Sequence, residues 1–261
     1  MNTPLRTCLL AVSIPGTLLQ LTQTATAQNT EIRIFCSNGI RAAMEKLLPQ
    51  DERITGRRIN VEYGASANFK RSIEAGAPFD LAILTPQLID DLIKEGKIAA
   101  GTEVQIASTG IGIAVRAGAP KPDVATGEAI KQLLLGSKSI GYVQVGAGTP
   151  AILDMLNHLG LQEALQSKTV FQPGAAESMK NLASGQVDVA LALISEILPA
   201  PGVQLAGPLP SQFQRAVTMA AGIASSTEDR EAVEKIIHGL TSVEAESIIK
   251  AAGLDPIKVK K

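Results

Sequence analysis

Several residue types are scarce in this chain of 261 residues. It has no tryptophan and only two tyrosines, and its 24 Lys and Arg are balanced by 25 Asp and Glu, so the formal net charge is −1. A nucleic-acid-binding protein usually carries a basic excess or a basic stripe with stacking aromatic residues. The composition therefore argues against a nucleic-acid partner. Two histidines and two cysteines are too few for a zinc cluster, and we expect no metal and no other cofactor.

Long apolar runs are also missing, apart from one near the start. Arg6 precedes a mostly apolar segment over residues 8–21, and the small residues Ala25 and Ala27 follow in the pattern that a signal peptidase recognises. The run is too short to span a bilayer as a stable helix. We therefore predict a signal peptide over residues 1–27, cleavage after Ala27 and export to the periplasm. The alternative is an unstructured N-terminus of a cytosolic protein.

Cleavage after Ala27 would leave Cys36 as the only thiol, so no internal disulfide is expected. Cys36 ends a predicted strand over residues 31–36. Nothing in the sequence places a histidine beside it, as a nucleophilic cysteine would need. We interpret Cys36 as a small buried apolar residue.

Strand-like and helix-like segments alternate along the rest of the chain. The strand-like segments are rich in β-branched residues, and the helix-like ones place apolar residues on one face, as Ile40, Met44, Leu47 and Leu48 do. Such alternation predicts an α/β fold with mostly parallel sheets and helices on both sides. The expected strands cover residues 31–36, 59–63, 80–84, 140–145, 187–193 and 217–223, and the expected helices begin at Gly39 or cover residues 68–75, 86–96 and 149–160.

Two further helices are expected near the end of the chain. Ser225 with Glu228, and Thr241 with Glu244, have the spacing of a capping box, in which a hydroxyl and a carboxylate satisfy the first backbone N–H groups of a helix. These pairs predict helix starts at Ser225 and Thr241.

Four strand-to-helix turns consist of small or polar residues: residues 37–39, 65–68, 146–149 and 174–178. Ligands of open α/β sheets bind beyond the carboxyl ends of the strands, where such turns lie. Helix N-termini there offer free N–H groups and a partial positive charge, which suits an anion. The turns predict an anion site without a metal. The alternative for each turn is that its serine or threonine only caps the following helix.

Other side chains are weaker candidates. Arg41 follows Gly39 and could hold a carboxylate, whereas Tyr142 and Glu177 could act as acid or base. Their alternatives are a solvated arginine, a half-buried tyrosine and a glutamate at a helix start. Asp80, directly before a strand, is interpreted as structural.

Residues 34–44, 64–68 and 73–80 together resemble the molybdate-binding family, the periplasmic solute-binding proteins of ABC importers with the type II fold. The resemblance implies two α/β lobes with a ligand in the cleft between them, joined by crossover strands that act as a hinge. The implied lobes are residues 28–110 with 217–261, and residues 111–216. The crossovers are expected near residues 110–117 and 215–219.

Members of that family hold an oxyanion with serine hydroxyls, backbone N–H groups and a tyrosine. The resemblance carries one serine to Ser66 and the backbone donors to the neighbourhoods of Gly148 and of Glu177 and Ser178. The second serine position falls at Gly39, two residues from Ser37, and the tyrosine position falls at Leu193. The predicted ligand-binding residues are Ser37, Asn38, Gly39, Ser66, Gly148, Thr149, Glu177 and Ser178, with Arg41, Asn68 and Tyr142 as further candidates.

Residues 110–123, 195–203 and 207–210 resemble a side branch of the same fold, the secreted aconitate isomerases. Two functions therefore stay open. The first is a monomeric periplasmic receptor that captures a small anion, a molybdate-like oxyanion or a small carboxylate, and delivers it to an ABC permease in the inner membrane. The second is an isomerase of aconitate or a similar tricarboxylate, for which Arg41, Lys70, Tyr142 and Glu177 are candidates without assigned roles.

Overall fold

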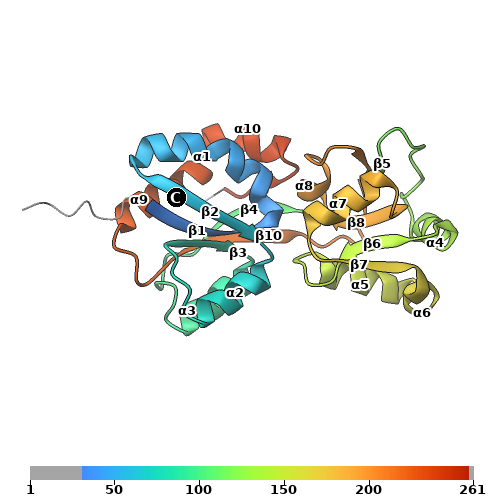
Figure 1. Cartoon of the computed structure of the whole chain (residues 1–261), viewed down its shortest axis with the longest axis horizontal. Helices are drawn as coiled ribbons and strands as arrows, with labels where there is room; N and C mark the ends of the chain where they lie inside the picture. The colour runs from blue at the N-terminus through green and yellow to red at the C-terminus, as the bar shows by residue number, and fades with distance from the viewer. Residues whose placement is uncertain (1–30, 259–261) are drawn as a thin grey trace, which may run out of the picture. The chain divides into compact units, whose positions relative to one another are not determined.

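A computed structural model describes residues 31–258 (Figure 1). The predicted signal peptide lies outside these residues. The described part contains two sheets, each with helices on both faces, so the predicted α/β class is confirmed. None of the helices within residues 31–258 has the length and apolar character needed to cross a bilayer.

The first sheet has six strands in the order β11-β4-β10-β3-β1-β2. Its strands are β1 (Glu31–Ser37), β2 (Arg58–Gly64), β3 (Leu81–Leu84), β4 (Val104–Thr109), β10 (Val217–Ile223) and β11 (Asp255–Pro256). One face of the sheet is covered by α1 (Arg41–Thr55), α9 (Arg230–Leu240) and α10 (Val243–Ala251), and the other by α2 (Ser66–Glu74) and α3 (Pro86–Lys94) (Figure 1). A short 3-10 helix, η1 (Asn38–Ile40), precedes α1.

The second sheet has five strands in the order β7-β6-β8-β5-β9. Its strands are β5 (Ile111–Arg116), β6 (Ile140–Val143), β7 (Thr169–Gln172), β8 (Val189–Leu193) and β9 (Val203–Pro208). Helices α7 (Ala175–Ser184) and α8 (Ile194–Ile197) lie on one face, and α4 (Gly127–Gly136), α5 (Thr149–His158) and α6 (Gln162–Leu165) lie on the other (Figure 1). The 3-10 helix η2 (Gln166–Lys168) follows α6.

In each sheet three neighbouring strands at one end are parallel, and the strands next to the crossovers are antiparallel to their neighbours. Strand β1 pairs in parallel with β2 and β3, and β6 pairs in parallel with β7 and β8. Strands β4 and β10 run antiparallel to each other, as β5 does to β8 and β9. The chain leaves the first sheet between β4 and β5, at Gly110, and returns between β9 and β10. The sheets are thus less parallel than predicted, because the strands next to the crossovers run against their neighbours.

The apolar core is divided by the sheets. Its largest cluster packs the first sheet against α1, α9 and α10 and continues through Ile111 into the layer between the second sheet and α4 and α5. A second cluster lies under α2 and α3, where the ring of Phe35 stacks on Phe69 and Phe79 at centroid distances of 4.8 and 5.9 Å. Each helix therefore buries one apolar stripe against a sheet, as the sequence periodicity predicts.

The helix starts predicted at Ser225 and Thr241 are wrong. The carboxylate of Asp229 and the hydroxyl of Ser242 cap α9 and α10, and each accepts from the backbone N–H three residues further on. Thr241 instead ends α9, since its hydroxyl donates to the carbonyl of Ile237 at 2.9 Å. A hydroxyl with a carboxylate three residues later is thus not sufficient to identify a cap.

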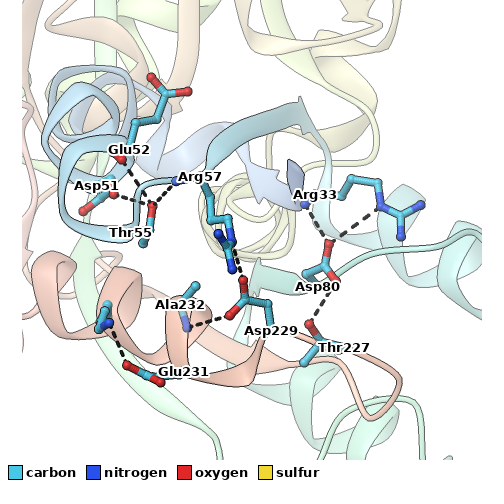
Figure 2. A network of polar contacts seen from close by, with 11 residues as sticks. Arg33, Asp51, Glu52, Thr55, Arg57, Asp80, Thr227, Asp229, Glu231 and Ala232 are labelled. Carbon is cyan, nitrogen blue, oxygen red and sulfur yellow. Dashed lines mark hydrogen bonds and ion pairs between the residues drawn. The ribbon is translucent and has the colours of Figure 1, made fainter. Parts of the chain in front are cut away.

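Polar contacts tie the start of the described chain to its last helices (Figure 2). The Asp80 carboxylate accepts from the backbone N–H of Arg33 at 2.8 Å and from the hydroxyl of Thr227 at 2.9 Å. The Arg57 guanidinium donates to Asp229 at 2.5 Å. The structural role predicted for Asp80 is confirmed by these two hydrogen bonds.

Candidate anion-binding site

A cavity of about 250 Å³ lies at the carboxyl ends of β1, β2, β6, β7 and β8. All four of the small-residue turns singled out in the sequence contribute to its lining, and they come from both sheets. Of the predicted ligand-binding residues, the lining contains Ser37, Asn38, Ser66, Asn68, Gly148 and Thr149. Four turns that are far apart in the sequence therefore meet at one place.

Three helices begin at this cavity without a side-chain cap. The N-cap residues Ala65 of α2, Gly148 of α5 and Gly174 of α7 all line the cavity, and none makes a side-chain cap hydrogen bond. The first N–H groups of an uncapped helix carry a partial positive charge and need acceptors. For these three turns the capping alternative does not hold, and the helix ends are free to face an anion.

Two predicted hydroxyls at the cavity are already used inside the protein. The Ser37 hydroxyl accepts from the N–H of Gly39 at 3.4 Å and so caps η1. The Thr149 hydroxyl donates to the carbonyl of Val143 at 2.6 Å and accepts from the N–H of Gly146 at 3.0 Å. These side chains hold the turns in place. Their effect on ligand binding is therefore mainly to fix the positions of the backbone groups at the cavity.

Two other hydroxyls at the cavity have no hydrogen-bond partner within residues 31–258. The Tyr63 hydroxyl and the Ser66 Oγ are both buried and both residues line the cavity. A buried polar group without a partner costs on the order of 1–3 kcal/mol, and a bound acceptor would remove that cost. Burial also raises the pKa of Tyr63 above its usual range, so the phenol stays a neutral donor. Tyr63 was not selected from the sequence, although only Gly64 separates it from the turn at residues 65–68.

Glu196 is the only charged side chain among the described residues that line this cavity. Burial raises the pKa of its carboxyl to about 7, and the backbone of Leu193 lowers it by less. Sequence reasoning missed Glu196 as a site residue. The only signal in the sequence was that Glu196 lies in the segment 195–203. That segment resembles the secreted aconitate isomerases, but the resemblance assigned no role to Glu196.

Gly39 and Leu193, where the family pattern expects a serine and a tyrosine, contact each other. A Cβ atom on Gly39 would lie 2.9 Å from Cδ1 of Leu193 and would also overlap Cε of Met219. On the other side, a Cβ on Gly148 would lie 3.1 Å from Cδ2 of Leu193. The Leu193 side chain thus fills the space between two glycines, and the serine of the family pattern has no room at Gly39.

The model of one protein family, the bacterial extracellular solute-binding proteins, matches residues 32–255. This chain belongs to that family. The match covers both sheets and every residue that lines the cavity.

Curated relatives of this solute-binding protein include both kinds of protein that the sequence resembles. An aconitate isomerase from a Pseudomonas species is 24% identical over 233 residues, which cover 87% of this chain and 88% of the relative. A molybdate-binding protein from Azotobacter vinelandii is 25% identical over 236 residues, which cover 87% of this chain and 90% of the relative. The suspected relationship to these two groups is confirmed.

The fold agrees with a solved structure, the periplasmic molybdate-binding protein of Azotobacter vinelandii. The two structures match with a TM-score of 0.73 at 21% identity, over 88% of this chain and 100% of the other. The predicted two-lobed type II fold is thereby confirmed. The lobe boundaries predicted from the sequence remain a prediction.

The remaining candidate residues of this solute-binding protein lie away from the cavity. Tyr142 faces Phe171, with ring centroids 5.4 Å apart, beside a separate cavity of about 340 Å³. Glu177 forms an exposed ion pair with Lys180 at 3.8 Å. Ser178 is buried and its hydroxyl has no partner within residues 31–258, but it lines none of the cavities described here. The backbone N–H of Ser178 is used within α7, since it donates to the carbonyl of Gly174 at 3.0 Å.

Arg41 does not line the cavity. Its guanidinium donates to Glu45 at 2.7 Å, and its Cζ lies 4.8 Å from the centre of the Tyr63 ring. Arg41 and Lys180 line a neighbouring space of about 620 Å³ that shares Glu196 with the cavity. On the opposite side, a space of about 720 Å³ shares Ser66 and contains Arg215. Within residues 31–258, positively charged side chains therefore line the two neighbouring spaces and not the cavity itself.

Two other chemistries lack support in the described residues. The Cys36 thiol is buried, and burial raises its pKa far above the usual range, so no thiolate nucleophile forms there. No group of three or more His, Cys, Asp or Glu within residues 31–258 is arranged to hold a metal ion.

Proposed function

We propose that this protein is the periplasmic substrate-binding protein of an ABC-type importer and that it captures a small anion in the 250 Å³ cavity. One observation carries the proposal. Three uncapped helix N-termini and the two unpartnered hydroxyls of Tyr63 and Ser66 all line the same cavity.

The donors at the cavity suit an anion that is recognised without a cation. Backbone N–H groups at helix ends and neutral hydroxyls offer hydrogen bonds in fixed directions, and no lysine or arginine of the described residues lines the cavity. Its volume lies below the range of about 300–1,000 Å³ that is typical of drug-sized ligands. A tetrahedral oxyanion or a single carboxylate group fits this size, and a larger carboxylate would extend into the neighbouring spaces with Arg41 or Arg215.

Delivery of the anion to an inner-membrane permease, action as a monomer and export through the predicted signal peptide complete the proposal. These parts are supported by membership of the solute-binding family and by the likeness to a periplasmic molybdate-binding protein. The ligand itself is left to experiment, because Gly39 and Leu193 remove two polar contacts of the family pattern.

A thermal-shift panel on residues 28–261 tests anion capture. The panel compares molybdate, tungstate, sulfate, citrate, and cis- and trans-aconitate. A ligand present at a hundredfold its Kd should stabilise the protein by about 2.7 kcal/mol. A shift with one class of anion supports the proposal and names the class, whereas no shift with any of them contradicts it.

Two serines give a matched pair of variants for the same assay. Ser66 and Ser178 are both buried with hydroxyls that lack a partner within residues 31–258, but only Ser66 lines the cavity. We expect Ser66→Ala to weaken anion binding about tenfold, since one hydrogen bond to a charged ligand is lost. Ser178→Ala should bind as the unsubstituted protein does. Equal affinity of Ser66→Ala and the unsubstituted protein would place the ligand elsewhere.

A second function, isomerisation of aconitate, is favoured by the carboxyl of Glu196 at the cavity and by the aconitate isomerase relative. Shifting the double bond requires a base that takes a proton from the carbon next to a carboxylate and an acid that returns one to the former alkene carbon. Incubation with cis-aconitate, followed by chromatographic detection of trans-aconitate, tests this activity. Product that disappears in Glu196→Gln would establish the isomerase, and no product above the uncatalysed level would exclude it.

A further inference from the structure

The anion cavity contains a feature that an oxyanion receptor does not need. Glu196 lies at the start of α8, directly after β8, and lines both the 250 Å³ cavity and the neighbouring space with Arg41. Its backbone is fixed from two sides, because the Ser195 hydroxyl donates to the carbonyl of Gly39 at 2.7 Å and the N–H of Ser195 donates to the Thr109 hydroxyl at 3.3 Å. The carboxyl is therefore held at the cavity by the fold.

A carboxylate and an anion in the same small cavity repel each other. Two like charges that share a buried site cannot both stay ionised at low cost, so a proton is held between them. The backbone of Leu193 lowers the pKa of Glu196 by less than burial raises it, and the carboxyl keeps acceptor capacity for a further hydrogen bond. A proton on Glu196 would turn that free capacity into a donor directed at the ligand.

We propose that Glu196 makes anion binding proton-linked, so that one proton lies between its carboxyl and the bound anion. This inference rests on the proposed capture of an anion in the same cavity. A dianion would then bind together with one proton from solution, and an anion that carries an acidic O–H would bring the proton itself. The site would thus select hydrogen-oxyanions and partly protonated carboxylates over fully ionised ligands at alkaline pH.

Among the titratable groups that line the cavity and the neighbouring space with Arg41, Glu196 is the best candidate to hold this proton. The groups that share these two spaces with Glu196 are Tyr63 on β2, Arg41 and Glu45 on α1, and Lys180 on α7. Strands β5, β8 and β9, which pack against α8, contribute no charged side chain to either space. Arg41 is already paired with Glu45, and burial keeps the Tyr63 phenol neutral.

The direction of the pH effect follows from the pKa of Glu196, which burial raises to about 7. Below pH 7 the free protein already holds the proton, so affinity for a dianion should be constant. Above pH 7 the free carboxyl is ionised and must take up a proton on binding. The Kd should then rise about tenfold for each pH unit.

Calorimetry measures this proton directly. The probe is whichever of sulfate, molybdate and trans-aconitate binds, since all three are fully ionised from about pH 7 to 9. Titration at pH 8 in two buffers of different ionisation enthalpy gives the number of protons taken up. We expect close to one proton for the unsubstituted protein and a Kd at pH 9 about tenfold above that at pH 8.

Glu196→Gln separates the proton from the shape of the side chain. Glutamine keeps a side-chain acceptor and offers a permanent donor, so we expect no proton uptake and a Kd that does not change with pH. Glu45→Gln, a carboxyl in the neighbouring space, should keep the uptake and the slope. A purely structural role of Glu196 would give an unsubstituted protein without proton uptake, and that result overturns the inference. Absence of binding by every anion of the thermal-shift panel would instead overturn the proposed function and this inference with it.

Discussion

At the scale of single residues, the burial of the Asp51 carboxyl has a measurable cost. Asp51 on α1 is 2% exposed, and its Oδ2 has no hydrogen-bond partner within residues 31–258. Burial raises the pKa of Asp51 to about 7. A raised carboxyl pKa means that the folded protein resists ionisation, so the cost is absent at about pH 4 and complete above pH 7.

We therefore expect Asp51→Asn to stabilise the protein by about 1–2 kcal/mol at pH 8 and to have little effect at pH 4. Urea unfolding of both proteins across this pH range measures the difference. Asp91→Asn, which changes a surface carboxylate paired with Lys94, is the control and should show no such trend. Parallel stability curves for Asp51→Asn and the unsubstituted protein would contradict the prediction.

The contrast between Cys36 and Asp51 shows what the sequence could reveal about single residues. Cys36 ends a run of strand residues, and its predicted burial is confirmed at 0% exposure. Asp51 lies in a polar stretch that gives no sign of burial. It is covered because α9 packs there with Gly239, where a Cβ would lie 2.7 Å from the Asp51 Oδ1. That contact joins residues far apart in the chain, so no local pattern contains it.

At the scale of elements, η1 and β8 meet through Gly39 and Leu193. We expect Gly39→Ser to destabilise the protein by about 1–3 kcal/mol, because its Cβ would lie 2.9 Å from Leu193 and would displace Met219. Leu193→Ala should destabilise by a similar amount through the cavity it creates. The two changes together should cost less than their sum, since the smaller residue at 193 makes room for the serine.

A double-mutant cycle by urea unfolding tests this coupling. A non-additive term above about 0.5 kcal/mol is expected for residues in contact. Strict additivity would mean that the serine finds its room by moving Met219 alone. Leu198→Ala, at an exposed leucine directly after α8, should show additivity with Gly39→Ser and serves as the control pair.

The elements themselves were largely predictable, whereas the site at their ends was only partly so. Periodicity and turn residues are local, and the expected strands fall close to observed ones, whereas two helix starts were wrong and β4, β7, β9 and α4 were not expected. The meeting of four turns follows from the general rule for the ends of parallel strands. Tyr63 and Glu196 were missed because the cavity that they line is assembled from turns far apart in the sequence. The family pattern could predict that Gly39 and Leu193 belong to the site. It could not predict that they contact each other.

At the scale of the whole molecule, the side chain of Gln214 joins the two passages of the chain between the sheets. Gln214, on the returning passage, accepts from the N–H of Ile111 at 2.7 Å and donates to the carbonyl of Ile111 at 2.9 Å. Ile111 directly follows Gly110, where the chain first crosses over, and a Cβ on Gly110 would lie 2.9 Å from the Gln214 amide carbon. The glycine leaves room for the amide, and the amide joins the two passages.

We expect Gln214→Ala to lower the free energy of unfolding by about 1–3 kcal/mol, because it leaves the N–H of Ile111 without this partner. The Ile111 carbonyl keeps the N–H of Leu209 at 3.0 Å. Amide hydrogen exchange should also become faster at Ile111 while the amides of β1 keep their rates. Gly110→Ala should act in the same direction, since its methyl group would displace the Gln214 amide.

Gln204→Ala is the matched control, because that glutamine also donates to backbone carbonyls beside β5, at its other end. It lies away from both passages, so it should leave exchange at Ile111 unchanged.

The family resemblance predicts that the two passages form a hinge. If they do, loosening them should change the dissociation rate of a bound anion more than it changes the contacts between the anion and the cavity. The dissociation rate of the anion from Gln214→Ala, measured by stopped flow, should then be higher than from the unsubstituted protein. An unchanged rate would mean that the Gln214 contact does not control the motion of the lobes.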